Sequence, residues 1–298
     1  MRLSILLISY NQQKYLKESL DSIFGQDIPF DYEIIVADDH STDDSISIIE
    51  SRLKMENCTY KILPSTVNLG ISKNYQRAFA ACSGEYIAVL EADDYWTDVQ
   101  RLKKHIAFLD NHQECVMSYN RLTYYFEDKK DFYLTLWKGE KDVEYYTTAE
   151  LAKRNNIVNL SACVLRNSAV KKLPKELFQI KIADWMLGMA MGLHGPLAKL
   201  KDPMSVYRVG GTGEWAKMSS RKKNLNTIEL IDIYNKFFQY KFNDEFAEHK
   251  NRLLIEENIN SQALSKDRGP GHFSIKSFIR WLIPVRVRNY VKQKMKSK

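Results

Sequence analysis

Residues 32–44 read YEIIVADDHSTDD, and this stretch decides the fold. Apart from Glu33, its first six residues are apolar or aromatic and most favour β-structure, as in a strand buried inside a sheet. Two carboxylates, Asp38 and Asp39, follow directly, and a helix then runs to about residue 55 with Ser41 or Thr42 as its N-cap. A strand that ends in acidic residues and leads into a helix is one unit of an α/β fold.

The same alternation continues through the first hundred residues. Residues 3–9 (LSILLIS) form an apolar run typical of a strand covered on both faces, and residues 10–24 show helical spacing. This pattern predicts a mostly parallel sheet flanked by helices, with its ligand site beyond the carboxyl ends of the strands. The further elements expected here are strands at 60–63 and 86–90 and helices at 71–81 and 98–110.

The second half of the chain is expected to supply the other wall of the cleft. We divide the chain into a main domain at 1–215, with one half at 1–112 and a second at 113–215, a helical extension at 216–265 and a tail at 266–298. The elements expected beyond residue 115 are β-like segments at 116–126, 132–137 and 198–207 and helices at 148–154, 184–193 and 224–264.

Composition and charge narrow the classes of function. The chain has 298 residues, is 44% hydrophobic and 27% charged, and carries a net charge of +7. Residues 266–298 hold ten Lys or Arg against one Asp, so the rest of the chain carries −2. This distribution argues against a nucleic-acid groove across the domain and favours an anionic surface at one end. The four cysteines have no CxxC spacing and are expected to be reduced core thiols.

The ends of the chain suggest where the protein works. The amino-terminal apolar run is too short for a signal peptide or a membrane span, so we expect it to be mature structure. In the tail, Ile275, Phe278 and Leu282 share one helical face and basic residues follow. We expect residues 272–298 to bind an anionic membrane surface, with the protein cytoplasmic at the inner face of the cell membrane. The alternative is a helix that packs on the parent domain.

Two acidic clusters follow predicted strands. A carboxylate at Asp38-Asp39 could accept a hydrogen bond from the base N3–H of uracil or thymine, although the cluster could also be a simple helix cap. Residues 91–94 (EADD) carry hard oxygen ligands that suit Mg²⁺ or Mn²⁺ beside a diphosphate. A solvated acidic turn is the alternative there. Trp96 is either packing or the floor of a sugar site.

Two further segments carry polar residues at helix starts. Residues 68–74 (NLGISKN) would let the backbone approach a phosphate or ribose, although Asn and Gly also make ordinary turns. Asp184 opens an apolar helix, where it is either the N-cap or a general base with a raised pKa.

Taken in series, these stretches resemble glycosyltransferase family 2, whose members have the GT-A fold. The matching stretches are residues 4–11, 34–43, 68–70, 91–96, 184–185 and 207–208. The resemblance implies a GT-A (Rossmann-like) sheet and an inverting transfer of sugar from a nucleoside-diphosphate donor, with Mn²⁺ or Mg²⁺ as cofactor. It also implies that residues 1–112 form the nucleotide-binding half of the main domain and residues 113–215 the acceptor-binding half. It implies Asp39 as the base-binding carboxylate, Asp94 as metal ligand with Asp93 at ribose or metal, and Asp184 as catalytic base. The donor-binding residues expected are Ser9, Tyr10, Asn11, Asp38, Asp39, Asn68, Gly70, Ser72, Asn74, Asp93, Trp96 and Arg208.

The chain departs from the family pattern at two places. Ala183 stands where relatives more often have Glu, and Gly210 stands where they often have a His that completes the metal site. The expected partners are a UDP-sugar or another nucleotide sugar and a glycan or lipid-linked glycan acceptor of cell-surface polysaccharide synthesis. The rivals are a sugar nucleotidyltransferase, which would want a glycine-rich basic loop near the amino end, and a catalytically decayed scaffold.

Overall fold

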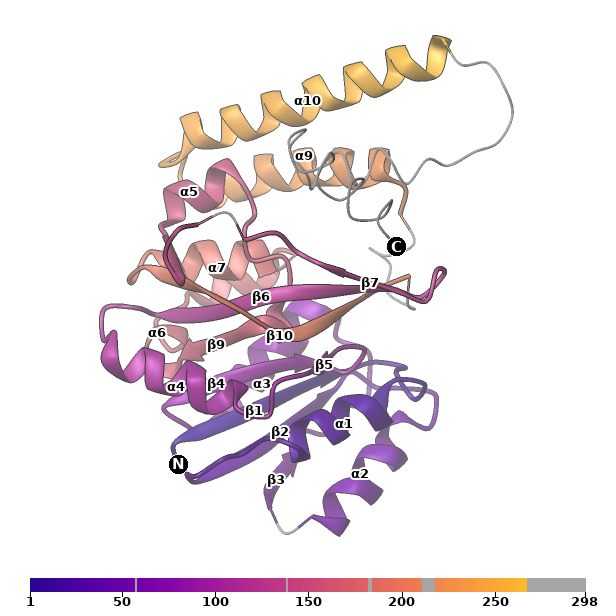
Figure 1. Ribbon diagram of the computed structural model, residues 1–298, viewed down its shortest axis with the longest axis vertical. Coiled ribbons are helices and arrows are strands. Elements are labelled where there is room, and N and C mark those ends of the chain that lie inside the picture. Colours follow the sequence, from indigo (N-terminus) through magenta and orange to yellow (C-terminus); the bar gives the residue numbers. More distant parts are fainter. Residues whose placement is uncertain (57, 138, 182–183, 211–217, 267–298) are drawn as a thin grey trace, which may run out of the picture.

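The computed structural model describes residues 1–56, 58–137, 139–181, 184–210 and 218–266, with side chains up to residue 257 (Figure 1). The expected membrane-binding tail at 266–298 lies outside the described residues except for Lys266. Among the described residues, no helix has the length and apolar character needed to cross a bilayer.

A ten-stranded mixed sheet forms the centre of the molecule, with helices on both faces (Figure 1). Its order is β3-β2-β1-β4-β9-β6-β10-β5, with β7 beside β6 and β8 beside β10. The strands are β1 (Leu3–Ser9), β2 (Tyr32–Asp38), β3 (Thr59–Ile62), β4 (Tyr86–Glu91), β5 (Tyr95–Trp96), β6 (Met117–Phe126), β7 (Asp131–Leu134), β8 (Val143–Tyr146), β9 (Cys163–Arg166) and β10 (Leu197–Val209).

The helices confirm most of the expected boundaries to within a few residues. They are α1 (Leu16–Phe24), α2 (Ser45–Met55), α3 (Ile71–Ala81), α4 (Arg101–Asn111), α5 (Thr148–Lys153), α6 (Asn167–Val170), α7 (Asp184–Gly192), α9 (Ser220–Phe237) and α10 (Asn243–Lys266), with 3₁₀ turns η1 (Leu160–Ala162) and η2 (Lys175–Gln179).

Strand β1 explains why the first half folds as predicted. It pairs in parallel with β2 on one side and β4 on the other. Every residue of the strand is buried, and alternate residues enter opposite cores: Leu6 joins one cluster, whereas Ile5 and Leu7 join the other. A strand covered on both faces must be apolar at successive positions, which is the pattern its sequence shows.

The second half differs from the prediction where short strands run antiparallel. Strand β9 pairs antiparallel with both β4 and β6, and so joins the two halves into one sheet. Its four residues are too few for their periodicity to distinguish a strand from a helix, so this strand was not predicted. The expected strand at 132–137 shortens to β7, and β5 and β8 are additional.

Two expectations about helices are wrong. The predicted helix at 224–264 is two antiparallel helices, α9 and α10, because the chain turns through Gln239 and Tyr240, both with positive φ. The predicted N-cap at Ser41 or Thr42 is also wrong, since α2 begins at Ser45 and the Ser41 hydroxyl donates to Asp38 instead.

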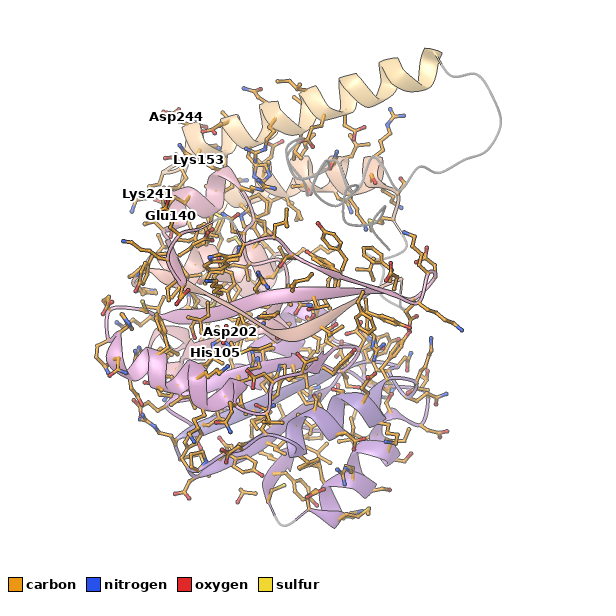
Figure 2. The ribbon with its side chains drawn as sticks, viewed as in Figure 1. His105, Glu140, Lys153, Asp202, Lys241 and Asp244 are labelled. Atoms are coloured by element: carbon orange, nitrogen blue, oxygen red, sulfur yellow. The ribbon has the colours of Figure 1, made fainter. Side chains whose placement is uncertain are left out.

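The cysteines and the buried histidine of α4 belong to the interior. All four cysteines are free, and three of them are buried, as expected from their spacing. His105 lies in the interior between α4 and the sheet (Figure 2), with Nδ1 2.8 Å from the Ser118 hydroxyl. Burial and the charge of Arg101 lower the pKa of His105 well below its usual range, so its ring is neutral at pH 7.

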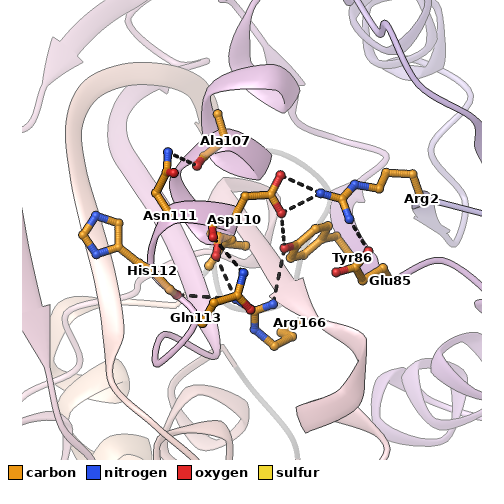
Figure 3. A network of polar contacts seen from close by, with 10 residues as sticks. Arg2, Glu85, Tyr86, Ala107, Asp110, Asn111, His112, Gln113 and Arg166 are labelled. Atoms are coloured by element: carbon orange, nitrogen blue, oxygen red, sulfur yellow. Dashed lines mark hydrogen bonds and ion pairs between the residues drawn. The ribbon is translucent and has the colours of Figure 1, made fainter.

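A polar network ties the amino ends of β1 and β4 to the end of α4 (Figure 3). The Arg2 guanidinium pairs with Glu85 and with both carboxylate oxygens of Asp110. The buried Tyr86 hydroxyl donates to the Asp110 carboxylate at 2.6 Å and accepts from the Arg166 guanidinium at 3.3 Å. These contacts fix the edge of the sheet opposite the carboxyl ends of the parallel strands.

We predict that Tyr86→Phe lowers the free energy of unfolding by about 1 kcal/mol, the net value of one hydrogen bond. Urea denaturation followed by circular dichroism measures the change. Tyr60→Phe, at a partly exposed tyrosine of β3, is the matched control and should leave the midpoint unchanged. Equal stability of Tyr86→Phe and the parent would show that the network contributes nothing to the fold.

Candidate nucleotide-sugar and metal site

The carboxyl ends of the parallel strands bring the predicted clusters to one edge of the sheet. In the strand register Ser9 lies opposite Asp38, and Ile8 lies opposite both Ala37 and Glu91. The segments that follow β1, β2 and β4 therefore meet at this edge, as the parallel arrangement requires.

Asp39 joins two of these segments directly. Its carboxylate accepts the backbone N–H groups of Leu69 and Gly70, both at 2.8 Å, and its own N–H donates to the Ser9 carbonyl at 2.9 Å. Gly70 has φ +79°, a left-handed conformation that favours glycine, and it precedes α3. The acidic cluster after β2 and the glycine segment before α3 are thus one unit, and the exposed Asn68 belongs to it by accepting the Gly70 N–H at 3.1 Å.

Asp38 and Asn11 hold the loops together. The Asp38 carboxylate accepts the N–H and the hydroxyl of Ser41, at 2.8 and 2.5 Å. Asn11 has φ +53°, and its side-chain oxygen accepts the Thr42 N–H at 2.8 Å. Both side chains therefore shape the loop, whereas Tyr10 beside them is 45% exposed and open to a ligand.

Three of the residues predicted to bind the nucleotide-sugar donor instead contact other parts of the protein next to the site. Asn74 is buried and donates from its side chain to the Ala37 carbonyl at 2.8 Å. Trp96 is also buried, with its ring 4.4 Å from the Arg101 guanidinium. The Ser72 hydroxyl donates to the Ile180 carbonyl at 2.8 Å. The Trp96 indole N–H donates to the Ser161 carbonyl at 2.9 Å, so the polar groups of both Asn74 and Trp96 are used inside the protein. The assignment of these two residues to contact with the sugar donor is therefore corrected, and Trp96 packs in the interior.

Three carboxylates, one at the end of β4 and two just after it, form a compact acidic cluster. One oxygen from each of Glu91, Asp93 and Asp94 lies within 4.8 Å of the others. Burial and the charge of Asp93 raise the pKa of Glu91 to about 7, and burial with both neighbours raises the pKa of Asp94 well above its usual range. Holding these carboxylates ionised together is costly, and a divalent cation between them would offset that cost.

Asp94 is held in place by three hydrogen bonds from the protein itself. One of its oxygens accepts from the Asn159 side chain at 2.8 Å and the Ser161 hydroxyl at 2.7 Å, and the other accepts the Arg208 backbone N–H at 3.0 Å. It is 1% exposed, whereas Asp93 and Glu91 are partly exposed. Asp94 therefore connects β10 and the start of η1 to the acidic cluster.

Arg208 presents its guanidinium to this cluster from β10. The group pairs with Glu18 of α1 and lies 4.9 to 5.5 Å from three tyrosine rings. Its Nε is buried without a hydrogen-bond partner among the described residues. Burial raises the pKa of Asp93, and the positive charge of Arg208 partly offsets this increase. The rings belong to Tyr15, Tyr95 and Tyr125.

Asp184 lies at the start of α7, where it accepts the Trp185 N–H at 2.7 Å. The Asn155 side chain lies 3.3 Å from its second oxygen. Burial raises the pKa of Asp184 despite these two hydrogen bonds. Its charge also contributes to the raised pKa of Glu91, so the two carboxyl groups lie within electrostatic range of one another.

One segment that was not predicted contacts both Asp94 and Asp184. Asn155 contacts Asp184, and Asn159 and Ser161 contact Asp94, all within one short connection between α5 and β9. The available signal was a run of asparagines (RNNIVN, 154–159) directly after a predicted helix. Val158 within it has φ +71°, an unusual conformation for a β-branched residue.

The profile described as glycosyl transferase family 2 matches residues 4–173 of this chain. The chain belongs to this family. An uncharacterized protein of Mycobacterium tuberculosis is 32% identical over 216 residues, which cover 72% of this chain and 60% of that protein. The poly(ribitol-phosphate) beta-N-acetylglucosaminyltransferase TarS of Staphylococcus aureus is 33% identical over 118 residues, or 39% of this chain and 20% of TarS. The chain thus spans at most about three fifths of these relatives.

Solved structures agree with the GT-A fold. The crystal structure of TarS residues 1–349 in complex with UDP-GlcNAc has a TM-score of 0.65 at 20% identity, covering 85% of this chain and 72% of that one. A mannosyltransferase of Pyrobaculum calidifontis in complex with GDP-Man and Mn²⁺ has a TM-score of 0.58 at 14% identity, covering 80% and 64%. At these identities the likeness shows the fold alone.

We predict that Asn159→Ala lowers the free energy of unfolding by about 1–3 kcal/mol, because it removes a donor from the fully buried Asp94 carboxylate. Thermal and urea denaturation measure the loss. Asn156→Ala, in the same loop at a partly exposed position, is the matched control and should change stability by less than about 0.5 kcal/mol. An equal effect of the two substitutions would contradict a specific role for Asn159.

Proposed function

We propose that this protein is an inverting glycosyltransferase that moves a sugar from a nucleoside-diphosphate donor, with UDP as the first candidate nucleoside diphosphate, to an acceptor hydroxyl. The observation that carries the proposal is the convergence of Asp39, the acidic cluster after β4 and Asp184 along the carboxyl edge of one GT-A sheet. Family membership and the nucleotide-sugar complexes of the structural neighbours support it.

The donor would lie across the ends of β1, β2 and β4. The exposed Tyr10 ring offers a face to the base, and each Asp39 oxygen keeps a lone pair beyond its backbone contacts for a base N3–H. The Arg208 guanidinium beside the acidic cluster would meet the diphosphate charge, for which its unpartnered Nε is suited.

The residues of the cluster fit Mg²⁺ or Mn²⁺, since their ligands are hard oxygens and their mutual repulsion calls for a cation. Asp93 and Glu91 would hold the ion, because they are the partly exposed members, with Asp94 contributing only the lone pairs left by its three protein donors. When bound, the ion offsets the negative charge that develops on the departing diphosphate.

Asp184 would act as the general base. It takes the proton of the acceptor hydroxyl as that oxygen bonds to the anomeric carbon, while the bond from this carbon to the diphosphate oxygen breaks and its electron pair leaves with the diphosphate. The raised pKa of Asp184 makes it a stronger base than an ordinary carboxylate. Attack opposite to the leaving group inverts the configuration.

The acceptor we propose is a glycan or lipid-linked glycan of the cell surface. Relatives named for poly(ribitol-phosphate) glycosylation and for amylovoran biosynthesis support this class. The basic tail at 266–298 would hold the protein at the inner face of the membrane, where such acceptors are assembled.

The metal assignment predicts that UDP binds tightly only with Mn²⁺ or Mg²⁺ present. Calorimetric titration of UDP should show affinity falling at least tenfold when the cation is omitted or when Asp93 is changed in Asp93→Asn. Asp128→Asn, which removes one exposed acid of the β6–β7 turn, is the charge-matched control. Equal UDP affinity with and without the cation would rule out the metal-dependent donor site.

The base assignment predicts that Asp184→Asn binds UDP normally but loses at least 100-fold in the rate of UDP release from UDP-GlcNAc. In the parent, the rate should fall as pH drops through the raised pKa of Asp184, and so at higher pH than for an ordinary aspartate, because only the deprotonated form accepts the proton. Retention of a near-normal rate in Asp184→Asn would remove this residue from the base role.

A further inference from the structure

The C-terminal helices pack against the residue that follows the proposed base. Trp185 is buried, and its indole N–H donates to the Leu151 carbonyl of α5 at 2.7 Å. Three aromatic side chains of α9 and α10 meet its ring edge-on, with centroid distances of 5.0 to 5.9 Å. They are Tyr234, Phe246 and His249.

Tyr234 also reaches the chain on the other side of Asp184. Its side chain is fully buried, and its hydroxyl donates to the Lys181 carbonyl at 3.1 Å. The charge of Asp184 contributes to the raised pKa of Tyr234, which shows that the two groups lie near one another. Tyr234 thus contacts the backbone of Lys181, before Asp184, and the ring of Trp185, after it.

Helix α10 fixes the segment that carries the partner of Asp184. His249 lies 3.1 Å through Nδ1 from the Ala152 carbonyl, and the Arg252 guanidinium donates to the Lys153 carbonyl. Burial lowers the pKa of His249 to about 4, so the ring is neutral and Nδ1 must carry the proton that it donates. These are last-turn carbonyls of α5, which otherwise lack helical partners.

The end of α5 leads directly into Asn155, which contacts Asp184. An ion pair between Lys153 and Glu248, 3.3 Å apart, adds to the same junction. Figure 2 shows Lys153 on α5 beside the start of α10, where Asp244 lies. The α9–α10 hairpin therefore holds both the helix that bears Asp184 and the loop that bears its side-chain partner.

We propose that the α9–α10 hairpin is a working part of the active site, with Tyr234 and His249 as positioning residues for Asp184. The proposal rests on the proposed role of Asp184 as base. It extends the catalytic unit beyond the sheet and α7 to the C-terminal helices α9 and α10. Loosening the hairpin should misplace the base and leave the donor site, on the far strands of the sheet, intact.

Deleting the hairpin would expose Trp185 and could unfold the protein, so the test uses Tyr234→Phe. This change keeps the ring against Trp185 and removes only the hydroxyl that bonds to Lys181. We expect kcat for UDP release from UDP-GlcNAc with Mn²⁺ to fall about fivefold to tenfold, the equivalent of one hydrogen bond, with UDP affinity unchanged. We also expect faster amide hydrogen exchange in the peptide covering Asp184–Gly192.

Tyr240→Phe, at the exposed turn between α9 and α10, is the matched control and should leave both readouts unchanged. His249→Leu, which removes the other contact, should reproduce the loss of kcat. Unchanged exchange in α7, or faster exchange with unchanged kcat, would overturn the positioning role. If the parent releases no UDP, the donor assignment fails separately, and the exchange readout still decides whether the hairpin orders the start of α7.

Discussion

The crowding of three carboxyl groups at the end of β4 is the constraint on which the site depends. Three carboxyl groups within 4.8 Å of one another cannot remain ionised in a protein interior without donors or cations around them. The chain provides donors from distant segments: the Tyr75 hydroxyl donates to Glu91 at 2.9 Å, and the backbone of β10 donates to Asp94. The mixed sheet is what brings β4 and β10 to the same place.

This constraint also explains the unusual connection between α5 and β9. Asn159 and Ser161 must reach Asp94, whereas Asn155, a few residues earlier, must reach Asp184. Meeting both demands in so short a segment places Val158 at φ +71°, a conformation that costs free energy for a β-branched residue. The strain is offset by the hydrogen bonds that the segment gives to two carboxylates, and these bonds connect the acidic cluster to Asp184.

The parallel half of the fold could be predicted from the sequence because strands buried on both faces are apolar at successive positions. Strand β1 and helix α3 have the predicted bounds, and the clusters after β2 and β4 fall at the predicted edge. The contacts between clusters could not be predicted, because Asp39 meets Gly70 and Asp94 meets Asn159 across 31 and 65 positions. Trp96 and Asn74 have side chains that suit either a ligand or the interior, and only the packing around them shows which.

At Gly210, where the family pattern often has a histidine, the chain lacks that side chain and has a left-handed backbone conformation. Gly210 has φ +100°, and among the described residues a Cβ placed there would meet nothing closer than 3.7 Å. Space therefore allows a side chain, but the left-handed backbone does not favour one, so a histidine could not be restored at this position without strain. A cation in this protein would depend more on Asp93, Glu91 and the donor's diphosphate than in relatives with that histidine. The partly exposed carboxylates at the end of β4 would then supply most of the metal affinity that the proposed reaction requires.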